Sequence, residues 1–202
     1  MDRKLLWTGA GIVLVLALVT ASLIIFAKPP SYRGTSYVEP FPSAPEFALT
    51  KADGTQFRLS DERGKIVLLF FGYTSCPDVC PTTLAELKQV TDKLGDKAQD
   101  TQVVFVSVDP DRDTPEKIQE YVDHFNSSFI GLSGTESELA PIWDEYSIVR
   151  EVTQSDSAFG VIINHTARLF LIGQNGNLRL SYSYGTPVDD IVHDIKLLLE
   201  QE

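Results

Sequence analysis

Sulfur and imidazole are scarce in this chain. Its 202 residues include two cysteines, three histidines and one methionine, which is Met1. A methionine-rich metal-binding tract is therefore excluded, and any chemistry with a soft metal must use the two cysteines. Basic runs are also absent, and the formal net charge is −11. This argues against a nucleic-acid partner, because nothing would neutralise the phosphates.

The bulk composition is that of an ordinary globular protein. Hydrophobic residues make up 43% of the chain and charged residues 22%. A core of this size needs no disulfide to stabilise it. The length allows one domain with additional segments.

Both cysteines lie in one stretch, Phe70–Pro81, with the sequence FFGYTSCPDVCP. An apolar, strand-like run precedes it, and a helical pattern follows from Thr82. Because residues four apart lie on one face of a helical turn, we expect Cys76 and Cys80 to direct both sulfurs to one point. A helix N-terminus at this place favours negative charge and lowers the thiolate pKa.

This geometry permits a reversible disulfide, a metal site or a structural disulfide. The structural disulfide is the weakest interpretation, because so small a loop removes little entropy from the unfolded chain. Two cysteines alone complete neither a tetrahedral zinc site nor an iron–sulfur site. A metal would therefore need a further ligand from elsewhere in the chain.

The N-terminal part predicts a membrane anchor. Leu5–Ala27 contains 23 residues without a charge, enough to cross a bilayer core of ~30 Å. We expect residues 1–4 to form a short cytoplasmic head. A cleaved signal peptide is the alternative, because Val19–Ala21 resembles a cleavage site. The apolar run continues past that point to Phe26, which favours an uncleaved anchor.

The next segment, residues 28–45, contains five prolines. This composition predicts an extended tether that keeps a domain away from the membrane. We expect the folded domain to occupy residues 46–202.

Strand and helix patterns alternate along residues 46–202. The predicted strands are Phe47–Leu49, Gln56–Leu59, Lys65–Phe71, Gln102–Val108, Phe129–Leu132, Phe159–Ile163, Arg168–Ile172 and Leu178–Tyr184. The predicted helices are Thr82–Gln99, 113–125, Thr135–Tyr146 and one that begins at Pro187. This order predicts an α/β sheet with helices on both faces. A cysteine pair between the first long strand and a helix indicates a thioredoxin-like fold, here with an extra N-terminal hairpin and a C-terminal hairpin insertion.

The three histidines differ in their surroundings. His124 and His193 lie off the apolar stripes of their helices, and we expect both to be solvated. His165 lies between two predicted strands, in the loop that faces the cysteine motif in a thioredoxin-like fold. Thioredoxins have a cis-proline in that loop, whereas this chain has no proline between Pro141 and Pro187. From the residues alone, His165 is equally a hydrogen-bonded loop residue or a metal ligand.

Three features together resemble the Sco/SenC family. They are the cysteine stretch Gly72–Pro81, the segment Val106–Pro115 with the sequence VSVDPDRDTP, and His165 ahead of a final hairpin. The resemblance covers about residues 46–200. Members of this family are membrane-anchored copper-binding proteins with a thioredoxin fold, which act in assembly of the dinuclear copper centre of cytochrome c oxidase.

The resemblance implies a ligand set and a setting. In the family, copper is held by the two motif cysteines and the histidine, which correspond to Cys76, Cys80 and His165. The expected cargo is copper as Cu(I) or Cu(II), and the expected partners are the copper-bearing oxidase subunit and other copper chaperones. The expected location is the bacterial inner membrane, with the domain on the periplasmic side. Asn164 departs from the pattern, because an acidic residue often precedes the histidine.

Acidic residues flank the cysteine motif and form part of the second segment. Asp78 suits turn formation between two prolines, with an extra oxygen ligand as the alternative. We expect Asp109, Arg112 and Asp113 to be loop and helix-cap residues. The resemblance implies that these three also shape the rim of the site.

Three functions compete at this point. The first is a copper metallochaperone, which is not an enzyme in the usual sense. The second is a thiol–disulfide oxidoreductase acting on cysteines of the oxidase subunit, because a reversible disulfide between Cys76 and Cys80 serves that chemistry equally. The third is a peroxiredoxin-like peroxidase, but no arginine lies near Cys76 in the sequence. The four-residue cysteine spacing, the missing cis-proline and His165 favour copper.

Overall fold

The computed structural model describes residues 31–154 and 160–201, and residues from Tyr32 onward form one compact unit. The predicted anchor, Leu5–Ala27, lies outside the described residues. Within the described part of the chain, no helix combines the length and the apolar character needed to cross a membrane.

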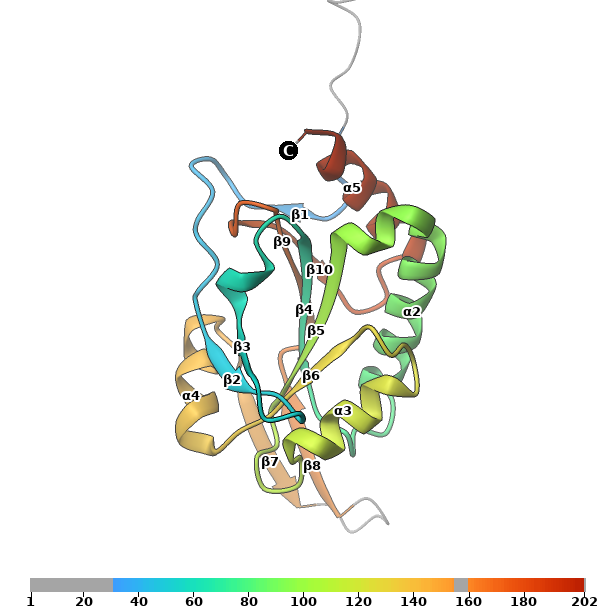
Figure 1. The fold of residues 1–202 in the computed structure, drawn as a ribbon. Helices are drawn as coiled ribbons and strands as arrows, with labels where there is room; N and C mark the ends of the chain where they lie inside the picture. Colours follow the sequence, from blue (N-terminus) through green and yellow to red (C-terminus); the bar gives the residue numbers. More distant parts are fainter. Residues whose placement is uncertain (1–30, 155–159, 202) are drawn as a thin grey trace, which may run out of the picture. The chain divides into compact units, whose positions relative to one another are not determined.

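A six-stranded sheet forms the centre of the unit, with the strand order β1-β10-β9-β4-β5-β6 (Figure 1). The strands are β1 (Thr35–Ser36), β4 (Ile66–Gly72), β5 (Thr101–Ser107), β6 (Ile130–Leu132), β9 (Arg168–Ile172) and β10 (Leu178–Ser183). β4, β5 and β6 are parallel, and β9 is antiparallel to β4. All seven residues of β4 are buried, which explains its unbroken apolar sequence.

Helices cover both faces of this sheet, as predicted (Figure 1). On one side lie α2 (Val79–Leu94), α3 (Pro115–Asp123) and α5 (Val188–Gln201). On the other side lie α4 (Glu136–Glu145) and the predicted N-terminal hairpin of β2 (Ala48–Thr50) and β3 (Gln56–Arg58). The α/β class and the thioredoxin-like arrangement of the prediction are therefore confirmed.

The local signals for helix starts are mostly confirmed. Thr114 caps α3, and Thr135 with Glu138 forms a capping box at α4. The exception is α2, which begins at Val79 rather than at Thr82. This earlier start places Cys80 inside the first helical turn.

The proline-rich segment differs from the prediction, because most of it belongs to the folded unit. Thr35 pairs with Ser181 of β10. The backbone N–H groups of Arg33 and Gly34 donate to the carboxylate of Asp194 at 2.8–3.0 Å. Asp194 lies on α5 and is completely buried. The folded unit therefore begins at residue 32, earlier than the predicted boundary near residue 46.

A second difference is a two-stranded sheet formed by β7 (Arg150–Gln154) and β8 (Val161–His165). Part of β8 was predicted, whereas β7 was not. Four of the five β7 residues are exposed, so the strand lacks the alternation of apolar and polar residues that a half-buried strand shows. The predicted hairpin of β9 and β10 is confirmed, with Gly176 in its turn at a φ of 80°.

Candidate functional site

The two cysteines lie where β4 leads into α2. Cys76 is half-buried in the connecting turn, and Cys80 is fully buried in the first turn of the helix. The backbone N–H of Cys80 donates to the Cys76 Sγ at 3.4 Å. Both residues are free thiols in this structure. The predicted convergence of the two sulfurs is therefore present.

The two thiols have opposite acid–base character. A hydrogen bond from the Cys80 thiol, helped by backbone N–H groups at the start of α2, lowers the pKa of Cys76 to about 6 against the opposing effect of burial. The same hydrogen bond, together with burial, raises the pKa of Cys80. Cys76 is thus a thiolate at neutral pH and Cys80 a thiol. The predicted lowering holds for Cys76 and is wrong for Cys80.

Gly72 makes room for this arrangement at the end of β4. A Cβ at this position would lie 2.7 Å from the Cys80 Sγ and 2.6 Å from the ring of Phe105. Neither neighbour has space to move, because both are completely buried. The glycine therefore allows the Cys80 sulfur to pack against the strand.

His165 is the last residue of β8, rather than a loop residue as predicted. Its Nε2 lies 3.8 Å from the Cys80 Sγ, and its Nδ1 lies 3.2 Å from the carbonyl oxygen of Thr166. A carbonyl only accepts, so Nδ1 carries the proton and Nε2 presents its lone pair to the sulfur. Burial lowers the pKa of His165, which keeps the imidazole neutral.

The other two histidines take part in different contacts. His124 is at the end of α3, where its Nδ1 lies 2.7 Å from the carbonyl oxygen of Glu120. His193 has its Nδ1 2.9 Å from the buried carboxylate of Asp194. His124 is exposed as predicted, whereas His193 supports the attachment of the N-terminal segment.

A hollow of about 200 Å³ opens beside Cys76 and His165. It lies between the turn that contains Asp78 and the residues Ile162–His165 of β8. Asp78 lines the hollow, and its side chain makes no capping hydrogen bond to α2. Asp78 therefore lies in the turn, as predicted, and its carboxylate is not used to cap α2. Among residues 31–154 and 160–201, no three His, Cys, Asp or Glu side chains form a group that holds a metal ion as it stands.

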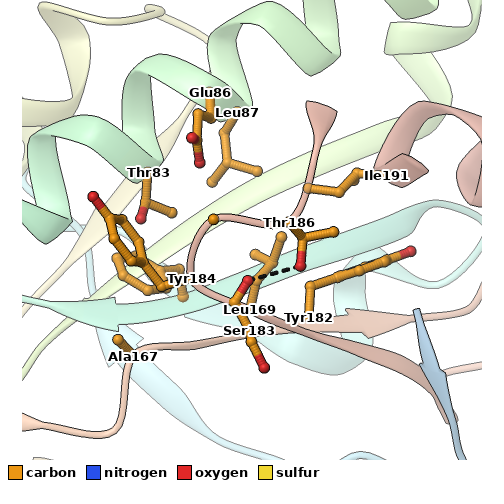
Figure 2. Close-up of a pocket in the computed structure, with 12 residues that line it drawn as sticks. Thr83, Glu86, Leu87, Ala167, Leu169, Tyr182, Ser183, Tyr184, Thr186 and Ile191 are labelled. Carbon is orange, nitrogen blue, oxygen red and sulfur yellow. Dashed lines mark hydrogen bonds between the residues drawn. The ribbon is translucent and has the colours of Figure 1, made fainter. Parts of the chain in front are cut away.

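A second hollow lies between α2 and the connection from β10 to α5 (Figure 2). Thr83 and Glu86 face it from α2, and Tyr184 and Thr186 from the connection (Figure 2). Burial raises the pKa of Glu86. The volume is about 20 Å³, room for a single water molecule. This hollow is too small for a substrate, and neither cysteine lines it.

The acidic segment after β5 is hydrogen-bonded to the turn that precedes Cys76. The buried carboxylate of Asp113 accepts hydrogen bonds from the Thr74 N–H at 3.1 Å, from the Thr74 hydroxyl at 2.5 Å and from the Ser107 hydroxyl at 2.9 Å. The expected role as a helix cap belongs to Thr114 instead. Asp113 therefore joins the turn before Cys76 to the end of β5.

The buried Asp109 forms an ion pair with the half-buried Arg112 in the same segment. Burial raises the pKa of Asp109, and the guanidinium of Arg112 lowers it. Arg112 also donates through Nη1 to the Val161 carbonyl of β8 at 2.9 Å. This pair thus connects the loop after β5 to the strand that carries His165.

The donor set suits a soft metal that changes oxidation state. A thiolate, a second thiol and a neutral imidazole would provide two sulfur ligands and one nitrogen ligand. Two sulfurs suit Cu(I), and an added imidazole suits Cu(II). The residues also fit dithiol chemistry, because a thiolate lies beside a protonated thiol.

Comparison of the sequence with known proteins relates this chain to one family. The family model described as SCO1/SenC matches residues 36–200. A SCO2-like protein of Rickettsia prowazekii is 33% identical over 159 residues, which cover 78% of each chain.

Solved structures give the same result. The solution structure of apo Sco1 from Thermus thermophilus has 40% sequence identity and a TM-score of 0.73, and the match covers 83% of this chain and 97% of that one. The structure of Bradyrhizobium japonicum ScoI with copper bound has 31% identity and a TM-score of 0.70, with coverage of 77% and 99%.

Proposed function

This chain belongs to the SCO1/SenC family, and from that premise we propose that it is a copper metallochaperone. Cys76, Cys80 and His165 hold the copper as cargo. The observation that carries this proposal is the 3.8 Å approach of the His165 Nε2 to the Cys80 Sγ, with the Cys76 thiolate beside it. Side chains from two distant parts of the sequence thus meet at one point.

The protonation states support reversible loading. Cys76 is a thiolate before copper arrives, so it is the first sulfur to bind. Cys80 must release its proton to become a ligand, which makes the affinity for copper rise with pH. The lone pair of the neutral His165 completes the site without loss of a proton.

Membership of the family supports a proposed destination for the copper. The copper goes to the dinuclear copper centre of cytochrome c oxidase, whose copper-bearing subunit is the partner, and other copper chaperones supply it. Leu5–Ala27 anchors the chain in the bacterial inner membrane, with the domain on the periplasmic side. This location places donor and acceptor at the same surface.

Thiol–disulfide exchange is the second candidate. The low pKa of Cys76 and the adjacent Cys80 thiol support it, because a thiolate next to a buried thiol is the arrangement of a dithiol reductant. In that case the chain would reduce the cysteines of the oxidase subunit before they receive copper.

Copper titration of the full chain in detergent tests the proposal. We expect the reduced chain to bind one copper per chain with a thiolate-to-copper absorption band, and the chain oxidised to a Cys76–Cys80 disulfide to bind none. A reduced chain that binds no copper but reduces a disulfide substrate would support the oxidoreductase instead. Full binding by the oxidised chain would contradict the proposed ligand set.

A further inference from the structure

The strand that carries His165 is not part of the central sheet. β8 pairs only with β7 among the described strands, and the two form a sheet of their own. Side chains attach this hairpin to the rest of the domain. Arg112 donates to the Val161 carbonyl at 2.9 Å, and the Ile163 N–H donates to the Tyr73 hydroxyl at 3.2 Å.

These two contacts lie on one edge of β8. Val161 and Ile163 are two residues apart, so their backbone groups point to the same side of the strand. Because these groups bond to Arg112 and Tyr73, two side chains take the hydrogen bonds that a neighbouring strand would otherwise make. His165 is two residues further along, and its side chain lies on the same face as the buried Ile163.

Tyr73 contacts both halves of the candidate site. It is almost completely buried, and its carbonyl accepts a hydrogen bond from the Cys76 N–H at 3.3 Å. Its ring meets the imidazole of His165 edge-on, with the ring centres 6.0 Å apart. The guanidinium of Arg112 lies over the Tyr73 ring, 5.6 Å from the ring centre.

We propose that Tyr73 and Arg112 are positioning residues that hold β8 against the domain, so that the imidazole of His165 faces the Cys80 sulfur. Neither side chain is a ligand, and each acts through the backbone of β8. This inference rests on the proposed function in one respect, since it takes His165 to be the nitrogen ligand.

Tyr73→Phe in the full chain tests the first contact, because it removes the hydroxyl and keeps the ring. We expect the Ile163 amide to exchange faster with solvent and the NMR signals of the His165 ring to broaden. Loss of one hydrogen bond should weaken Cu(II) binding about fivefold. Cu(I) binding should stay within about twofold, because the thiolates suffice for it. Tyr184→Phe is the control, since Tyr184 is exposed.

Arg112→Lys tests the second contact, because it keeps the charge and removes the fork that reaches both Asp109 and Val161. We expect the same selective loss of Cu(II) binding. Arg63→Lys is a matched control, because Arg63 also donates through Nη1 to a backbone carbonyl, that of Asn175, at 2.8 Å.

The outcomes separate the two proposals. If His165→Ala weakens Cu(II) binding while both positioning variants bind Cu(II) like the wild type, the positioning role is overturned and the copper site stands. If His165→Ala has no effect, the nitrogen ligand is wrong, and the copper-free NMR signals decide the positioning role alone. Unchanged His165 signals in Tyr73→Phe would then overturn it, and broadened signals would support it.

Discussion

The cysteine turn and the β7–β8 hairpin supply the two parts of the candidate site, and they are attached in different ways. The turn continues directly from the buried strand β4 into α2, and Asp113 fixes it from below through Thr74. The hairpin lies outside the central sheet, and β7 is mostly exposed. The sulfur positions therefore follow from the core, whereas the imidazole position depends on a few side-chain contacts.

This difference suits a protein that gives its metal away. A site with fixed sulfurs keeps its affinity for Cu(I) when the imidazole withdraws. Among the described residues no backbone ladder joins β8 to the six-stranded sheet, so in the proposed copper site a movement of β8 would leave the core in place. On the proposed function, the hairpin is the part through which copper release and the preference for Cu(I) or Cu(II) would be adjusted.

The cysteine turn, with Cys76 and Cys80, is the fixed half of the candidate site. The largest expected effect comes from replacing either of these cysteines. Cys76→Ser and Cys80→Ser should each weaken binding of Cu(I) and Cu(II) by more than the roughly 10–100-fold that loss of a supporting residue costs. Competition titration with a chromophoric chelator measures both affinities. Ser75→Ala is the control within the same turn. Retention of wild-type Cu(I) affinity in either serine variant would remove that cysteine from the site.

Gly72→Ala tests the fixed half without touching a ligand. The added methyl group overlaps the Cys80 sulfur and the Phe105 ring, so it should lower the free energy of unfolding by about 1–3 kcal/mol and displace the sulfur. Urea unfolding and Cu(I) titration check these effects. An unchanged unfolding midpoint together with unchanged copper affinity would show that the sulfur has more room than the geometry gives it.

Alkylation at different pH values tests the difference between the two thiols. The thiolate is the reactive form, and the pKa of Cys76 lies at about 6. The rate at Cys76 should therefore level off above pH 7 and fall about tenfold for each pH unit below 6. Cys80, buried and with a raised pKa, should react far more slowly. Peptide mapping by mass spectrometry separates the two, and a Cys76 rate that keeps rising to pH 9 would contradict the low pKa.

The smallest effect on copper binding is expected from a change at Asp194, which attaches the N-terminal segment to α5. Asp194→Ala leaves the N–H groups of Arg33 and Gly34 without their acceptor and should cost about 3 kcal/mol of unfolding free energy. Copper affinity in both oxidation states should match that of the wild type, because neither half of the site contacts Asp194. A weakened copper site in a fully folded Asp194→Ala chain would show that the two regions are coupled.

The sequence predicted the fixed half of the site well. The apolar run of β4, the cysteine spacing and the helix that follows are local signals, and the structure places Cys76 and Cys80 together as expected. The opposite pKa shifts of the two thiols were not predictable, because they depend first on the hydrogen bond between the two thiols and then on the burial of Cys80.

The β7–β8 hairpin and its attachment were harder to predict from the sequence. β7 has no apolar alternation, and the bond from Tyr73 to Ile163 joins residues 90 positions apart. Tyr73 stood inside the cysteine stretch without an assigned role, and only its contact with β8 gives it one. The attachment of residues 32–45 was missed for a similar reason, since Asp194 is distant in sequence and prolines alone indicate an open segment.

The most direct measurement compares copper binding by the wild type and by His165→Ala in both oxidation states. The account predicts that His165→Ala binds Cu(I) nearly as the wild type does, loses at least about tenfold in Cu(II) affinity, and shows an altered thiolate-to-copper absorption. His124→Ala, which removes an exposed histidine at the end of α3, should behave like the wild type in both titrations. A His165→Ala chain with the wild-type Cu(II) affinity and spectrum would contradict the division into fixed sulfurs and an adjustable imidazole.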